Sequence, residues 1–191
     1  MAFGTGIMHR PNRLHRDNLP EPPNNWSELQ KHSQKEGFIQ AAKKEYGDLF
    51  RWSTFRKVQR PTNMQVLGVR WVFVYKFDTD GYLERHKARL CIQGDMQECS
   101  REDNYTTTLA GWTFRALTVI TAAFDLEARQ YDVVSAFTNS LLDEIVYIEC
   151  PDGFKEWGIC LLLLRALYGL RQLPRLWLED ITSTLTKLGL T

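Results

Sequence analysis

Hydrophobic and polar positions change period along the chain, and each period predicts a type of element. Between residues 34 and 50 the apolar positions have the spacing of an amphipathic helix. The apolar stripe consists of Phe38, Ala41, Ala42, Tyr46 and Leu49. We therefore expect one face of this helix to pack against the core, with its last turn weakened by a glycine at position 47.

The next segment has the alternating pattern of a β-strand. Between residues 69 and 77, aromatic and branched side chains alternate with a second set that includes two cations. Asp80-Gly81 then provides a tight turn, and residues 82–92 are expected to form the returning strand of a hairpin. Exposing Trp71, Phe73 and their aromatic neighbours to water would be unfavourable, so we expect this face to be core rather than a platform for stacking bases.

The second half of the chain predicts further helices and strands. Thr113 is a candidate N-cap for a helix with the apolar stripe Phe114, Leu117, Ile120 and Phe124. Residues 128–134 return to an extended pattern that ends at Asp132. Strands are expected at residues 145–149 and 159–164, with a turn at residues 151–153 between them.

A proline begins the last predicted helix. Pro174 is suited to the first turn of a helix, and the inward residues would be Leu176, Trp177, Ile181, Leu185 and Leu188. Helices interleaved with hairpins predict an α+β fold, in which an antiparallel sheet has helices packed on it.

Composition and charge add modest constraints. The chain has 191 residues and a formal net charge of +1, so its overall charge does not indicate a nucleic-acid binder. Residues 1–24 are basic and contain several prolines, which predicts a flexible arm. The sequence shows no signal peptide and no membrane-spanning run, so we expect an intracellular protein with reduced cysteines and no membrane contact. It predicts neither a compartment nor an oligomeric state.

Five segments, in this order, resemble a known family. They are WVFVYKFDTDGYL, KARLCIQGDMQ, YTTTLAGWTFRAL, QYDVVSAFTNSLLDEIVYIECPDGF and ALYGLRQLPRLW. Together they resemble the reverse transcriptase domain of copia-type LTR retrotransposons, and the form TLAGWTFRAL resembles the fungal branch of that family. The resemblance extends from about residue 26 to the last residue.

The resemblance implies a partial right-hand polymerase. Residues 25–191 would form a partial reverse transcriptase domain, with fingers at about 25–112 and part of the palm at about 113–191. Asp132 would be the first catalytic aspartate and a ligand of Mg²⁺, since metal-assisted nucleotidyl transfer needs carboxylate oxygens on a rigid element. Without the motif around it, Asp132 would be an ordinary acid at the end of a strand. The implied partners are an RNA or DNA template-primer and a deoxynucleoside triphosphate.

The resemblance also implies residues that bind the nucleotide. Lys87 and Arg89 would contact the triphosphate, whereas alternation on a hairpin without the motif would indicate ordinary solvated cations. The backbone amides of Ser135 and Ala136 would lie near the same phosphates. Phe137 resembles a steric gate against a ribose 2′-hydroxyl, with a core phenylalanine as the alternative.

The ALYGLRQLPRLW segment implies a palm element under the templating base pair. Gly169 would allow a close approach of the backbone to the nucleotide. Arg171 and Arg175 could contact the nucleic-acid backbone, or they could be exposed arginines at a junction between a loop and a helix.

The family's Y-x-D-D motif does not occur in these residues. LEDI at residues 178–181 continues the helical stripe, so Glu179 and Asp180 are expected to be solvent-facing helix charges. A single catalytic carboxylate predicts that this chain is inactive as a polymerase. The alternatives are a non-catalytic nucleic-acid-binding module and a decayed remnant with no selected function.

Overall fold

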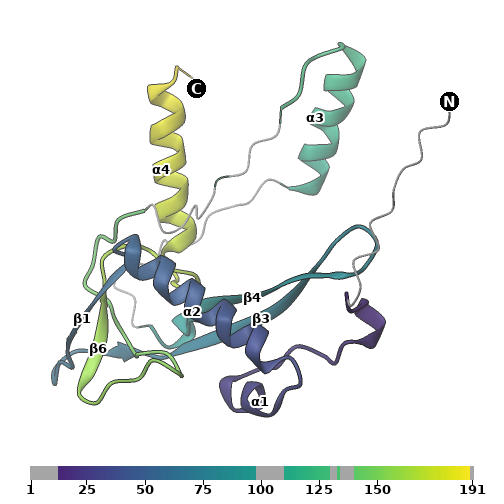
Figure 1. Ribbon diagram of the computed structural model, residues 1–191. Helices are drawn as coiled ribbons and strands as arrows, with labels where there is room; N and C mark the ends of the chain where they lie inside the picture. The colour runs from purple at the N-terminus through teal and green to yellow at the C-terminus, as the bar shows by residue number, and fades with distance from the viewer. Residues whose placement is uncertain (1–12, 98–109, 130–132, 134–139, 190–191) are drawn as a thin grey trace.

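The computed structural model describes residues 13–97, 110–129, 133 and 140–189. It has a mixed α/β architecture with helices and antiparallel strands, so the predicted fold class is confirmed at that level. Helix α2 (Lys35–Arg51) crosses the hairpin formed by β3 (Val69–Phe77) and β4 (Leu83–Ile92), while α3 (Gly111–Ala123) and α4 (Leu173–Lys187) extend away from the sheets (Figure 1).

The predicted helix and hairpin in the first half are both confirmed. Strands β3 and β4 pair in antiparallel register from Val69 opposite Ile92 onward. Phe38 of α2 is fully buried and its ring lies 5.4 Å from that of Phe73, while Trp71 is also buried. The short helix α1 (Trp26–Lys31) adds its buried Leu29 to the same core, and Asn25 caps this helix by accepting from the N–H of Glu28. The aromatic face of the hairpin is therefore core, as predicted.

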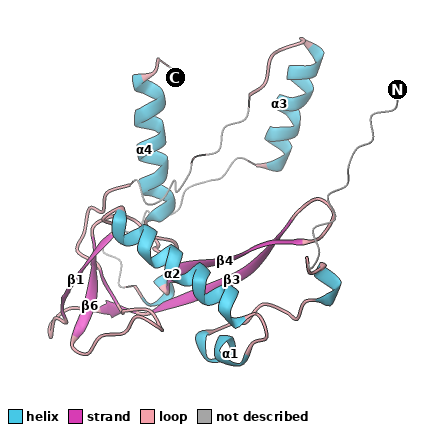
Figure 2. Ribbon diagram, in the orientation of Figure 1, coloured by secondary structure: helices cyan, strands magenta, loops and turns pink. Residues whose placement is uncertain are grey.

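A second sheet lies beside the hairpin (Figure 2). Its strand order is β1 (Phe55–Gln59), β6 (Ile159–Leu163), β5 (Tyr147–Ile148) and β2 (Val66–Leu67). The predicted strands at 145–149 and 159–164 correspond to β5 and β6, which pair antiparallel. β1 pairs antiparallel with β6, whereas β2 and β5 are parallel. The pairing of β1 with β6 brings together segments from the first and second halves of the chain in one sheet.

The N-terminal segment is ordered earlier than predicted. We expected a flexible arm as far as residue 24, but residues 13–18 lie against the tip of the hairpin. The N–H of Leu83 donates to Leu14 O over 2.8 Å, and the N–H of Arg16 donates to Gly81 O over 3.0 Å. Arg13 also forms an ion pair with Asp78 at 2.7 Å. These contacts with the hairpin tip, which a basic and proline-containing composition does not encode, are the reason for the difference.

The helices of the second half differ from the prediction in their start and in their packing. Helix α3 begins at Gly111 with Ala110 as N-cap and no capping side chain, so the expected cap at Thr113 is wrong. Its stripe, which we expected to face a core, is exposed among the described residues, with Phe114 at 63% and Phe124 at 73%. The cause is geometric, because α3 stands apart from both sheets (Figure 1).

The buried residues of α4 lie in its first turn. Leu173 and Leu176 are buried, whereas Leu188, expected to face inward, is 71% exposed. Glu179 and Asp180 are exposed charges on this helix, as predicted for LEDI. None of the described helices is long and apolar enough to cross a membrane.

One half-buried histidine makes the packing of α2 on the hairpin sensitive to pH. The ring of His86 lies 4.7 Å from that of Phe38 and against Gly37, where a methyl group would clash with it. Burial lowers the pKa of His86 from the usual 6.5, and the nearby charge of His32 lowers it further. The folded state therefore binds a proton less readily than the unfolded chain.

We expect the free energy of unfolding to fall as the pH drops below about 6.5, because protonation then favours the unfolded chain, with at most about 1.4 kcal/mol per pH unit from this group. Urea denaturation between neutral and mildly acidic pH measures the slope. His86→Phe should reduce it, and His15→Phe, at the less buried N-terminal segment, serves as the control. Equal slopes in the wild type and His86→Phe would contradict the prediction.

Candidate nucleotide and nucleic-acid interface

One face of the β3–β4 hairpin is basic. Residues that stand opposite each other in an antiparallel pair point to the same side of the sheet. The register places Arg70 opposite Cys91, Val72 opposite Arg89, Val74 opposite Lys87, and Lys76 opposite Arg85. These side chains lie on the side away from the aromatic core, and none of them is acidic. We call the five cations among them, Arg70, Lys76, Arg85, Lys87 and Arg89, the basic face.

Little on the neighbouring elements neutralises the basic face. Within the described part of the chain, none of its five cations forms an ion pair with a carboxylate. Burial lowers the pKa of Lys87, and the positive charges around it lower the pKa further, whereas Glu45 on α2 raises it. Burial also disfavours the charged form of Glu45 and so raises its pKa. Both pKa directions are opposite to those of a tight ion pair, so Glu45 and Lys87 do not form one.

The loop that precedes α4 is fixed against the end of β4. The N–H of Ile92 donates to Tyr168 O over 2.7 Å. Gly169 has φ +98° and is packed so closely that a side chain there would clash with Ile92 O, and a side chain at Gly94 would clash with Gly169 O. The guanidinium of Arg89 lies 5.9 Å from the centre of the Tyr168 ring. The predicted sites on β4 and in this loop are thus brought together.

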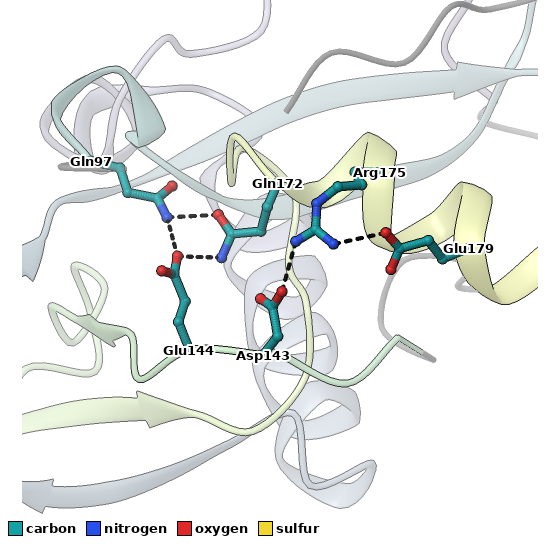
Figure 3. A network of polar contacts seen from close by, with 6 residues as sticks. All are labelled: Gln97, Asp143, Glu144, Gln172, Arg175 and Glu179. Carbon is teal, nitrogen blue, oxygen red and sulfur yellow. Dashed lines mark hydrogen bonds and ion pairs between the residues drawn. The ribbon is translucent and has the colours of Figure 1, made fainter. Parts of the chain in front are cut away.

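A buried polar network holds the other end of this loop (Figure 3). Gln97 Nε2 donates to Gln172 Oε1 over 2.7 Å and to Glu144 Oε1 over 2.9 Å, and Gln172 Nε2 donates to the same Glu144 oxygen over 2.7 Å. Gln97 Oε1 accepts from the N–H of Arg171 over 3.2 Å. Sequence reasoning missed Gln97 and Gln172, because a periodic pattern does not signal a buried amide. Gln172 is only 2% exposed.

Comparison with known proteins decides the family. Residues 52–191, well over half of the chain, match the family model described as reverse transcriptase (RNA-dependent DNA polymerase). This chain belongs to that reverse transcriptase family. The prediction made from its sequence motifs is therefore confirmed at the level of the family.

Relatives of this reverse transcriptase chain come from plants and from yeast. The Pol polyprotein of transposon TNT 1-94 from Nicotiana tabacum is 33% identical over 81% of this chain and 12% of that protein. The Pol polyprotein of transposon RE1 from Arabidopsis thaliana is 31% identical over 68% of this chain and 9% of that protein. The transposon Ty1-ER2 Gag-Pol polyprotein from Saccharomyces cerevisiae is 29% identical over 81% of this chain and 9% of that protein. No solved structure matches.

These matches refine the assignment. The chain spans about a tenth of the length of these relatives, which agrees with a fragment of a copia-type reverse transcriptase. The expected fungal branch is not supported, because the two plant relatives are more similar to the chain than the yeast relative is. The variant TLAGWTFRAL, on which that expectation rested, is too short a segment to outweigh similarity over the whole match.

The structure describes some of the predicted residues of the reverse transcriptase site and not others. Asp132, Ser135, Ala136 and Phe137 lie outside the described residues. Lys87 and Arg89 lie on the basic face, half-buried. The approach that Gly169 permits is to the backbone of β4, whereas the family resemblance implied an approach to the nucleotide. The fold itself therefore requires glycine at position 169, because φ is +98° and a side chain would clash with the Ile92 carbonyl oxygen.

The two arginines of the ALYGLRQLPRLW segment in this reverse transcriptase chain form contacts within the chain. Arg171 Nη2 donates to Asp95 O over 2.6 Å, and its side chain is exposed. Arg175 forms ion pairs with Asp143 and Glu179, both at 2.8 Å (Figure 3), and its side chain is 17% exposed. Of the two, Arg171 is therefore better placed to reach a phosphate.

Divalent metal ions are generally used by reverse transcriptases. Among residues 13–97, 110–129, 133 and 140–189, no group of three or more acidic, histidine or cysteine side chains could hold a metal ion. Asp132, the candidate ligand, lies outside these residues, and its expected role in binding Mg²⁺ stays a prediction.

Proposed function

We propose that this chain forms the fingers and the first part of the palm of a right-hand polymerase in a copia-type Pol polyprotein. In this proposal residues of about 25–112 are fingers, and residues of about 113–191 belong to the palm. The basic face of the β3–β4 hairpin is the surface turned toward the phosphates of nucleotide and template-primer. The observation that supports it is the concentration of five cations on one side of two strands, none of them in an ion pair with a described carboxylate.

Within this proposal the residues have separate roles. Lys87 and Arg89 bind the triphosphate, where cations offset the charge of the phosphate oxygens. The amides of Ser135 and Ala136 assist them, and Phe137 lies against the sugar. Asp132 holds Mg²⁺, which when bound supplies electrostatic stabilisation to the reacting phosphate. Because nucleotidyl transfer through two metal ions needs more carboxylates than Asp132, the function proposed for these 191 residues themselves is phosphate binding.

Charge reversal on the basic face tests the proposal. We expect Lys87→Glu/Arg89→Glu to weaken the affinity for a single-stranded oligonucleotide by about tenfold or more, since two phosphate contacts become repulsive. The affinity is measured by fluorescence anisotropy at several salt concentrations. The wild type should show a steeper dependence of affinity on salt than the variant, with similar affinity for unrelated oligonucleotide sequences.

The matched control reverses the same number of charges elsewhere. Lys31→Glu/Lys43→Glu changes two exposed lysines of α1 and α2. It alters the net charge equally but leaves the basic face intact, so a small loss of affinity is expected. An equal loss in both double variants would show that only net charge matters, and would overturn the proposed surface.

A further inference from the structure

Tyr168 lies where it can orient one of the two candidate phosphate-binding cations. Its ring centre is 5.9 Å from the guanidinium carbon of Arg89, within the range of a cation–π interaction. Arg89 is half-buried on the basic face and has no ion pair with a described carboxylate. Lys87, the neighbouring candidate, has no such contact with an aromatic ring among the described residues.

The position of the Tyr168 ring is set by the backbone around it. Tyr168 O accepts from the N–H of Ile92 over 2.7 Å, and Gly169 is interlocked with the end of β4. On the other side of the loop, the N–H of Arg171 donates to Gln97 Oε1. These bonds do not use the tyrosine side chain, so they keep the loop in place when that side chain is changed.

An aromatic ring orients a guanidinium without neutralising it. A carboxylate partner would cancel the charge that a phosphate needs, whereas a ring face attracts the cation and leaves its N–H donors available to oxygen acceptors. An arginine restrained in this way loses less conformational freedom when it binds. We propose that Tyr168 is a positioning residue for Arg89, holding its guanidinium on the basic face ready for phosphate. This inference rests on the proposed phosphate-binding role of Arg89.

A double-mutant cycle in the full chain tests the inference, with a single-stranded oligothymidylate as the probe. Tyr168→Ala is expected to weaken binding about fivefold, the scale of a partly exposed cation–π contact. Tyr168→Phe, which keeps the ring, should bind like the wild type. Tyr168→Leu, which keeps apolar bulk without a ring, should behave like Tyr168→Ala and replaces it if the alanine variant does not fold. Arg89→Ala/Tyr168→Ala should bind no more weakly than Arg89→Ala alone.

The outcomes separate this inference from the proposed function. If Arg89→Ala weakens binding while Tyr168→Ala and Tyr168→Leu do not, the positioning role is wrong and the basic face stands. If the two losses add in the double variant, Tyr168 acts independently of Arg89 and the inference is overturned. If Arg89→Ala binds like the wild type, the proposed role of Arg89 fails first, and the inference fails with it. Equal melting temperatures across the series confirm that folding is not the cause.

Discussion

Replacing Gly169 with alanine is expected to lower the free energy of unfolding by about 3 to 4 kcal/mol. Two effects contribute to this loss. The residue has φ +98°, a conformation that disfavours any side chain, and the new methyl group would clash with Ile92 O. Because the clash involves backbone, the strand or the loop must shift. Urea denaturation followed by circular dichroism measures the change.

Gly189→Ala is the matched control for the effect of Gly169→Ala. Gly189 also has a positive φ, at +79°, but no atom lies within 4 Å of the position that its Cβ would occupy. This variant therefore carries the conformational cost alone, about 1 to 2 kcal/mol. If Gly169→Ala and Gly189→Ala lose the same free energy, the close packing of the loop against β4 contributes nothing and the account of Gly169 is wrong.

The second large effect is expected for Gln172→Ala, at about 2 to 3 kcal/mol of unfolding free energy. Gln172 is buried, and its amide both accepts from Gln97 and donates to the Glu144 carboxylate. Alanine removes both hydrogen bonds, one of them to a charged group, and leaves space in a packed region. The free energy of unfolding is again measured with urea.

An exposed glutamine provides the comparison for Gln172→Ala. Gln30→Ala makes the same substitution on the outer side of α1, and is expected to change stability by less than about 0.5 kcal/mol. A cycle of Gln172→Ala with Gln97→Ala should show a coupling of about 1 kcal/mol, because the two amides share a hydrogen bond. Additive losses would mean that the two amides act separately, contrary to the geometry.

Local patterns predicted the first half of the fold well. The stripe of α2 and the alternation of β3 and β4 each occur within a short stretch of sequence, and the burial of Phe38, Trp71 and Phe73 satisfies both patterns. The turn at Asp80-Gly81 is also local, since Gly81 has φ +84°. In this half of the chain the period of the sequence and the packing of the side chains agree.

Contacts between distant segments were not predictable in this way. The strand at residues 55–59 has little alternation and is specified by its partner β6, and the segment at residues 13–18 is ordered by the hairpin tip. Among the candidate site residues, the motifs indicated Lys87, Arg89 and Gly169. They did not indicate that the Tyr168 ring lies under Arg89. Nor did they indicate that Gln97 and Gln172 form a hydrogen bond. Such pairings depend on tertiary structure, which a single sequence does not display.

The hydrogen bond between Gln97 and Gln172 can form only late in the synthesis of the chain. Gln97 and Gln172 are 75 residues apart, whereas α2 and the β3–β4 hairpin are complete by Ile92. On a ribosome the helix and the hairpin can therefore assemble while the partners of Gln97 have not yet been made. Until then the end of β4 has no loop against it, and the nascent chain carries an uncovered strand end.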